Sequence, residues 1–130
     1  MKDFEIVTIK SDGKSYIVIP FVKCINGIHA ADENTIKLKI TDSAEKLGEA
    51  VMKSFDYIKE KHTKGELCTE MKNFPSWKKY EDITVHLYDD GKIVLGLDYK
   101  DEPYYSYQQI ETRAFYGIIP EQLGDEIKSA

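Results

Sequence analysis

Three histidines are the candidates for a general base, which a nucleophilic serine, cysteine or threonine would need beside it. His86 lies in the run ITVHLY, whose apolar residues alternate as on one face of a β-strand, so we expect His86 to be half-exposed on the other face. An enzyme that uses His86 with a nearby acid is the alternative. His29 follows an Asn-Gly turn and His62 ends a lysine-rich helix, so both are expected at the solvated surface. The chain carries no HExxH, GxSxG, kinase or EF-hand pattern, and we predict no catalytic residues.

Acidic and thiol side chains could bind a metal, but their spacing does not favour it. Asp98, Asp101 and Glu102 lack a regular ligand spacing and have Lys100 among them, so neither a metal site nor another cofactor is predicted. Cys24 and Cys68 occur without a CxxC pattern or a neighbouring histidine. We therefore expect two ordinary thiols rather than a disulfide or a zinc site.

The segment 96–117, GLDYKDEPYYSYQQIETRAFYG, interleaves acidic residues with five of the nine tyrosines of the chain. Tyrosine offers a large contact area with a polar tip, and neighbouring acids steer a cationic partner. We predict a protein-binding surface made by Asp98, Asp101, Glu102, Tyr104 and Tyr105. The alternative for Tyr105 and Tyr107 is packing within a strand beneath the helices. Stacking on single-stranded nucleic acid normally requires a positive groove, which these charges do not provide.

The composition of the 130 residues indicates one soluble domain, residues 1–130. The formal net charge is −5 and Arg113 is the only arginine, which argues against a nucleic-acid partner. A membrane partner is not expected either, because no apolar run approaches the length of a transmembrane helix. The N-terminus resembles no secretory signal, so we expect a cytoplasmic protein.

Two similar phrases, EKLGEAV at 45–51 and EQLGDEI at 121–127, each follow a pair of β-prone runs around an Asp-Gly turn. A third β-prone run precedes each phrase, TIKLKI at 35–40 and IETRAFYGII at 110–119. Gly13 and Gly91 are 78 residues apart, and Leu47 and Leu123 are 76 apart. This pattern predicts an α+β fold with an antiparallel sheet and two main helices, in which a ββ(β)α unit is duplicated at about 4–61 and 81–130.

The first helix has the clearest pattern, with cap residues at 41–43 and an apolar stripe that extends to Ile58, so it should end near Lys61. Pro120 suits the first turn of the second helix. Gly48 and Gly124 lie inside the helices, which suggests close approach of helix to sheet. The connector 62–80 is polar and lysine-rich, and we expect Phe74 and Trp77 to pack on the fold, with an exposed recognition site at Trp77 as the alternative.

The blocks DSAEKLGEAVMKSF at 42–55 and SWKKYE at 76–81, in a small acidic chain, resemble the immunity proteins of bacterial contact-dependent growth inhibition systems. The resemblance covers about 20 residues, which look structural. It implies a cytosolic protein that binds the toxic C-terminal domain of an incoming effector, commonly a nuclease, and masks its active site. It transfers no catalytic residue.

These observations favour a non-catalytic immunity protein that neutralises a cognate, basic toxin domain through the predicted tyrosine-and-acid surface. The alternative is a small-molecule-binding or regulatory domain with its ligand held between the two repeats, which predicts a sizeable pocket lined by Tyr and Phe.

Overall fold

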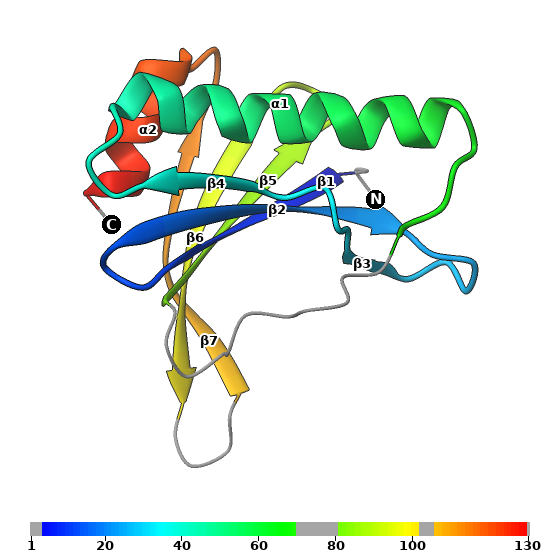
Figure 1. Cartoon of the computed structure of the whole chain (residues 1–130), viewed down its shortest axis with the longest axis horizontal. Coiled ribbons are helices and arrows are strands. Elements are labelled where there is room, and N and C mark those ends of the chain that lie inside the picture. Colours follow the sequence, from blue (N-terminus) through cyan, green and yellow to red (C-terminus); the bar gives the residue numbers. More distant parts are fainter. Residues whose placement is uncertain (1–3, 70–80, 102–105, 130) are drawn as a thin grey trace.

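The structure is a computed structural model that describes residues 4–69, 81–101 and 106–129; within the strands, the side chains of 81, 97–101 and 106–112 are outside this description. The chain forms seven strands and two helices in this part: β1 Phe4–Ser11, β2 Ser15–Lys23, β3 His29–Ala31, β4 Ile36–Lys39, α1 Ala44–Thr63, β5 Glu81–Tyr88, β6 Ile93–Asp101, β7 Ser106–Phe115 and α2 Pro120–Lys128 (Figure 1). An antiparallel sheet with two main helices confirms the predicted α+β class.

Both Asp-Gly turns form the expected hairpins. Gly13 has a φ of 84° and Gly91 a φ of 88°, a conformation that glycine adopts without a Cβ clash. In the first turn Asp12 Oδ1 accepts hydrogen bonds from the backbone N–H groups of Lys14 and Ser15, at 2.9 and 2.8 Å. In the second turn Asp90 Oδ1 accepts from the backbone N–H of Lys92 at 3.0 Å. The carboxylates thus fix the loops that set the register of each strand pair.

The strands lie in the order β3-β2-β1-β5-β6-β7, with β4 also paired to β2. β1 and β5 are central neighbours, with Val7 opposite Val85. In each half a hairpin is followed by a strand on its outer edge and then by a helix. The predicted run at 35–40 is β4, whereas the one predicted at 110–119 starts at Ser106 and ends at Phe115. The short strand β3 was not predicted.

Helix α1 begins as its sequence indicates and ends two residues beyond the predicted Lys61. The Ser43 side chain accepts a hydrogen bond from the backbone N–H of Lys46 at 3.2 Å, which caps the first turn. Its apolar stripe is fully buried against the sheet at Leu47, Val51, Phe55 and Ile58. Helix α2 carries Pro120 in its first turn, as expected.

The two helices cross at their glycines. A Cβ at Gly48 would overlap the Pro120 carbonyl, and a Cβ at Gly124 would overlap the Ala44 carbonyl. The expectation that these glycines allow helix to approach sheet is therefore wrong: they allow helix to approach helix. Each glycine faces the first residue of the other helix, so the contact is reciprocal.

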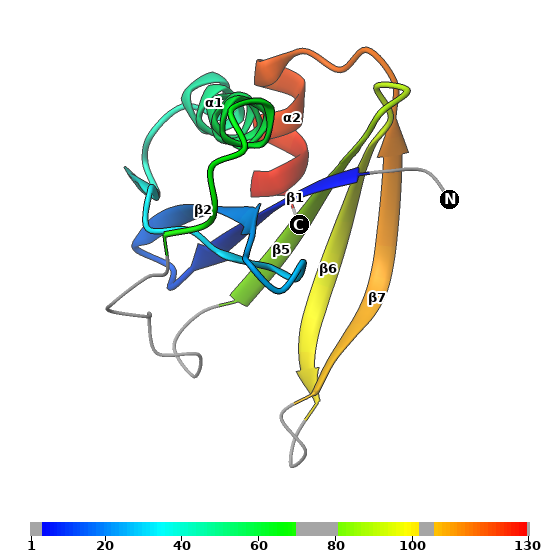
Figure 2. The same cartoon turned by 90° about the vertical axis from the view of Figure 1, so that its right-hand side faces the viewer.

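Both helices cover the same face of the sheet (Figure 2). The main core lies between the helices and alternate strand residues, and includes Val7, Ile9 and Val85 of the sheet and Leu123 of α2. The opposite face of the sheet carries a second cluster on β2 and β3, around Ile17 and Ile19. On the same side Lys10 Nζ donates to Asp82 Oδ1 at 2.8 Å, and both side chains are buried.

None of the helices in the described ranges is long and apolar enough to cross a membrane. Phe74 and Trp77, which were expected to pack on the fold, lie outside the described residues.

Candidate functional site

The predicted tyrosine-and-acid surface belongs to the β6–β7 hairpin. Pairing between β5 and β6 ends at Asp82 and Asp98, whereas β6 and β7 remain paired as far as Asp101 and Ser106. The last residues of the hairpin therefore have no third strand beside them in the described sheet, and this end projects beyond it (Figures 1 and 2). A register shift between Leu97 and Asp98 marks the start of the projecting part.

The structure places only two of the five predicted contact residues. Asp98 and Asp101 lie on β6, one at each end of the projecting part. Their side chains, together with Glu102, Tyr104 and Tyr105, are outside the described part of the chain. The grouping of these five residues into one surface stays a prediction.

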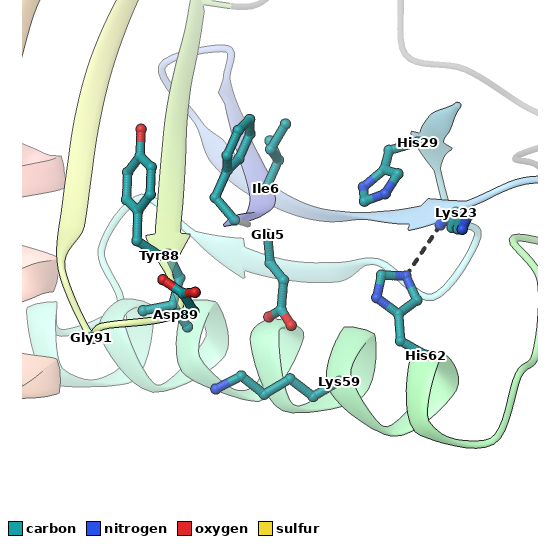
Figure 3. A pocket seen from close by; sticks show the side chains of 11 residues that line it. Glu5, Ile6, Lys23, His29, Lys59, His62, Tyr88, Asp89 and Gly91 are labelled. Atoms are coloured by element: carbon teal, nitrogen blue, oxygen red, sulfur yellow. Dashed lines mark hydrogen bonds between the residues drawn. The ribbon is translucent and has the colours of Figure 1, made fainter. Parts of the chain in front are cut away.

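A groove of about 730 Å³ lies elsewhere, where β1 begins and where β2, β5 and α1 end (Figure 3). It has aromatic, basic and acidic walls from both halves of the chain: Phe4, Glu5, Ile6, Lys23, His29, Lys59, His62, Leu87, Tyr88, Asp89 and Gly91. The volume is in the range of small-molecule sites. No sequence motif pointed to it, because its walls come from five separate elements, β1, β2, β3, β5 and α1.

Glu5 is the acidic group with incomplete hydrogen bonding in this groove. It points toward α1, which carries Lys59 (Figure 3). Its Oε2 atom is buried and has no hydrogen-bond partner among the described residues. Burial raises the pKa of Glu5, as does Asp56, while Lys59 acts in the opposite direction. A ligand that donates a hydrogen bond or carries a positive charge would satisfy this oxygen.

His29 and His62 form a pair at the other end of the groove. Their ring centroids are 5.5 Å apart, and His62 Nε2 accepts a hydrogen bond from the backbone N–H of Lys23 at 3.3 Å. Burial lowers the pKa of His62, and His29 and Lys23 lower it further. Both rings are half-buried, so the expectation of two solvated surface histidines is wrong. An Nε2 that accepts a hydrogen bond requires the neutral imidazole with its proton on Nδ1.

His86 is half-exposed on its strand, as predicted. It lies beside two aromatic rings, with centroid distances of 5.1 Å to Phe4 and 6.5 Å to Tyr88. Phe4 is also 5.4 Å from Tyr88, and 40% of its surface is exposed. Of these three rings, Phe4 and Tyr88 line the groove.

Cys24 and Cys68 are two free thiols, and they lie beside one another, which the sequence did not predict. Their side chains contact one another, although both are free cysteines in this structure. They are 44 positions apart, and the segment after α1 returns to the end of β2 to bring them together. The described residues contain no cluster of three or more His, Cys, Asp or Glu side chains arranged to hold a metal ion.

Solved structures with the same fold are known at very low sequence identity. A protein of unknown function from Neisseria meningitidis, NMB0488, superposes with a TM-score of 0.67 at 12% identity, over 97% of this chain and 92% of the other. A chain of the CdiA-CT/CdiI toxin and immunity complex from Yersinia pseudotuberculosis superposes with a TM-score of 0.62 at 8% identity, over 97% and 94%. No protein-family model and no curated protein matches the sequence. At such identities the likeness shows a shared fold.

Proposed function

We propose that this chain is a non-catalytic immunity protein that binds a cognate toxin domain of the nuclease class in the cytoplasm and neutralises it by masking its active site. The observation that carries the proposal is the fold shared, over nearly the whole of both chains, with a chain of a toxin and immunity complex. The sequence blocks at 42–55 and 76–81 point to the same group of proteins.

The charge and shape of the β6–β7 hairpin support a basic polypeptide as the partner. The chain has a net charge of −5. Asp98 lies where the hairpin leaves the sheet, and Asp101 lies on the part that projects beyond it. Such a projection can enter a cleft of a partner, and its acids raise the association rate of a cationic protein. A stable complex of this kind buries about 1,600 Å² in total.

Co-expression with the toxin tests this proposal. If a gene for a large secreted effector lies immediately upstream, its C-terminal domain should arrest growth when it is expressed alone, and co-expression of this chain should restore growth. Expression of this chain alone should leave growth unchanged. Growth arrest by this chain would indicate that it is itself a toxin and not an immunity protein. Failure to protect against that domain would contradict the proposal.

Charge reversal within the hairpin tests the contact surface. Asp98→Lys, Asp101→Lys and Glu102→Lys weaken protection, and Tyr104→Ala and Tyr105→Ala remove aromatic contacts that carry a large share of interface energy. Glu49→Lys is the matched control, because Glu49 is an exposed acid on α1. Full protection by all five variants would remove this surface from consideration and leave the fold-based proposal to be tested elsewhere on the chain.

A second candidate, ligand binding, is favoured by the groove and by the buried Glu5 oxygen within it. A small cationic or hydrogen-bond-donating molecule beside Phe4 and Tyr88 would fit these walls. Thermal-shift screening against polyamines, amino acids and amides should then give a compound that raises the melting temperature, less so in Glu5→Gln. The absence of any such compound would count against this function.

A further inference from the structure

The segment that follows α1 packs along the end of β2 and carries Cys68 to the side of Cys24. The backbone N–H of Cys68 donates to the Lys23 carbonyl at 3.0 Å, so Cys68 lies opposite the residue that precedes Cys24. Cys68 Sγ lies 3.5 Å from the carbonyl oxygens of both Ala30 and Ala31 on the neighbouring strand β3. These contacts hold the Cys68 side chain against the β2–β3 hairpin.

Cys24 is held on the same hairpin by its own backbone. Its N–H donates to the Ile28 carbonyl at 2.8 Å and its carbonyl accepts from the Gly27 N–H at 2.9 Å, which closes the turn between β2 and β3. The Cys24 and Cys68 side chains contact each other and are both half-buried, so small oxidants can reach them. The chain has only these two cysteines, so neither has another thiol partner within the same molecule.

We propose that Cys24 and Cys68 are an oxidisable dithiol site, which hydroperoxides or low-molecular-weight disulfides convert to an intramolecular disulfide. The disulfide would close the chain from residue 24 to residue 68 and tie the segment that follows α1 covalently to the turn that follows β2. This inference does not depend on toxin binding.

The two thiols take different parts in the reaction. Burial raises the pKa of Cys68 to about 12, and contact with Cys24 adds to the effect, so Cys68 stays protonated at neutral pH. Attack of the Cys24 sulfur on the peroxide breaks the O–O bond and gives a sulfenic acid and hydroxide. Cys68 sulfur then attacks the sulfenic sulfur, the S–S bond forms, and hydroxide leaves. The protons of the two thiols convert both hydroxides to water, so one peroxide is reduced for each disulfide formed.

With a low-molecular-weight disulfide the same site reacts by exchange. The Cys24 thiolate attacks one sulfur of glutathione disulfide and releases glutathione thiolate. Cys68 sulfur resolves the mixed disulfide, releasing a second glutathione as its proton is transferred. Both routes end at the same intramolecular bond.

The experiment treats the full-length protein separately with hydrogen peroxide and with glutathione disulfide, and counts free thiols by alkylation and intact mass. We expect both thiols to be lost together in a monomer that is lighter by two hydrogen atoms, with one cross-linked peptide pair containing Cys24 and Cys68. Closure of this loop should raise the melting temperature by about 10 °C, and dithiothreitol should reverse the change.

Cys24→Ser and Cys68→Ser are the matched controls, since each leaves one thiol. Neither variant should show the oxidant-dependent rise in melting temperature, and glutathione disulfide should leave a glutathione adduct on Cys24 of Cys68→Ser. Retention of both thiols in the oxidised wild type, or cross-links only between molecules, would overturn the proposal without bearing on toxin binding. So would an equal rise in melting temperature in either single variant.

Discussion

Asp32 joins three segments of the chain through one buried carboxylate. Its side chain is fully buried and accepts hydrogen bonds from Tyr57 Oη at 2.9 Å and from Lys61 Nζ at 3.2 Å, both on α1. The backbone N–H groups of Asn34 and Thr69 each donate to it at 3.0 Å. The carboxylate therefore fixes the end of α1 and the returning segment that carries Cys68 beside β3.

Asp32→Asn should lower the free energy of unfolding by about 3 kcal/mol, because it removes the buried charge that pairs with the half-buried Lys61 and turns one acceptor oxygen into a donor. Urea unfolding measures the change. Asp56→Asn is the matched control, an exposed acid on α1 whose replacement should change stability by less than about 0.5 kcal/mol. Equal effects of the two substitutions would show that the hydrogen bonds to Asp32 do not stabilise the fold.

The same carboxylate predicts a dependence on acid pH. Burial raises the pKa of Asp32, but the hydrogen bonds from Asn34, Thr69, Tyr57 and Lys61 outweigh it and hold the pKa below its ordinary value. An acid whose pKa is lower in the folded state stabilises the fold above its unfolded pKa, about 3.9, and loses this contribution as the pH falls through the folded pKa. The stability difference between wild type and Asp32→Asn should therefore shrink below about pH 4. A constant difference down to pH 2 would contradict this.

His62 should titrate below 6.5. Burial, His29 and Lys23 all lower its pKa in the folded state, so the unfolded chain takes up a proton at higher pH than the folded chain does. The contribution of neutral His62 to the free energy of unfolding is thus complete above about pH 7. It declines as the pH falls through 6.5 toward the pKa of His62 in the folded state. NMR titration of the His62 ring measures the value directly. A midpoint at or above 6.5 would show that the hydrogen bond from Lys23 and the burial of the ring are absent in solution.

Residue patterns in the sequence revealed turns and caps but not these clusters. The Asp12-Gly13 turn and the Ser43 cap are local, since their partners lie two or three residues away. The contacts of Asp32 with Tyr57 and of His62 with Lys23 span 25 and 39 positions. They depend on where α1 ends relative to β2 and β3, and no local spacing encodes that distance.

At the scale of elements, the crossing of α1 and α2 depends on two glycines. Gly48→Ala or Gly124→Ala should each lower the free energy of unfolding by about 2 kcal/mol or more, because the added methyl overlaps a backbone carbonyl that belongs to the other helix. Alanine gains about 1 kcal/mol of helix propensity, so the measured loss is what remains after that gain.

Glu49→Ala provides the control for the glycine substitutions, because Glu49 is exposed on the adjacent position of α1. It should leave stability within about 0.5 kcal/mol of wild type. If Gly48→Ala were more stable than wild type, propensity would outweigh the steric overlap and the helices would not cross as closely as they do here.

We propose that the two halves, about 4–61 and 81–130, arose by duplication of one unit. In both, a hairpin with a glycine turn is followed by an outer strand and a helix, and each helix glycine faces the first residue of the opposite helix. The sequence indicated this order because turns and helix stripes are short-range patterns. It missed β3, whose three residues are too few for a period to be seen.

At the scale of the molecule, the sequence predicted the α+β class and the antiparallel sheet, but it did not predict which face each helix covers. Two helices with apolar stripes could cover one face or both faces of a sheet. The reciprocal glycines bring the helices together, so both lie on one face (Figure 2). The groove could not be predicted either, since it forms where the ends of five separate elements meet.

Binding of the purified toxin domain tests the central claim most directly. Isothermal titration of this chain with the C-terminal toxin domain of its cognate effector should give one-to-one binding with a dissociation constant in the nanomolar range, about 10⁻⁸ M or tighter. In the same mixture, the nuclease activity of the toxin domain should fall to background once the two proteins are equimolar. No detectable heat of binding, together with full nuclease activity in excess of this chain, would contradict the account.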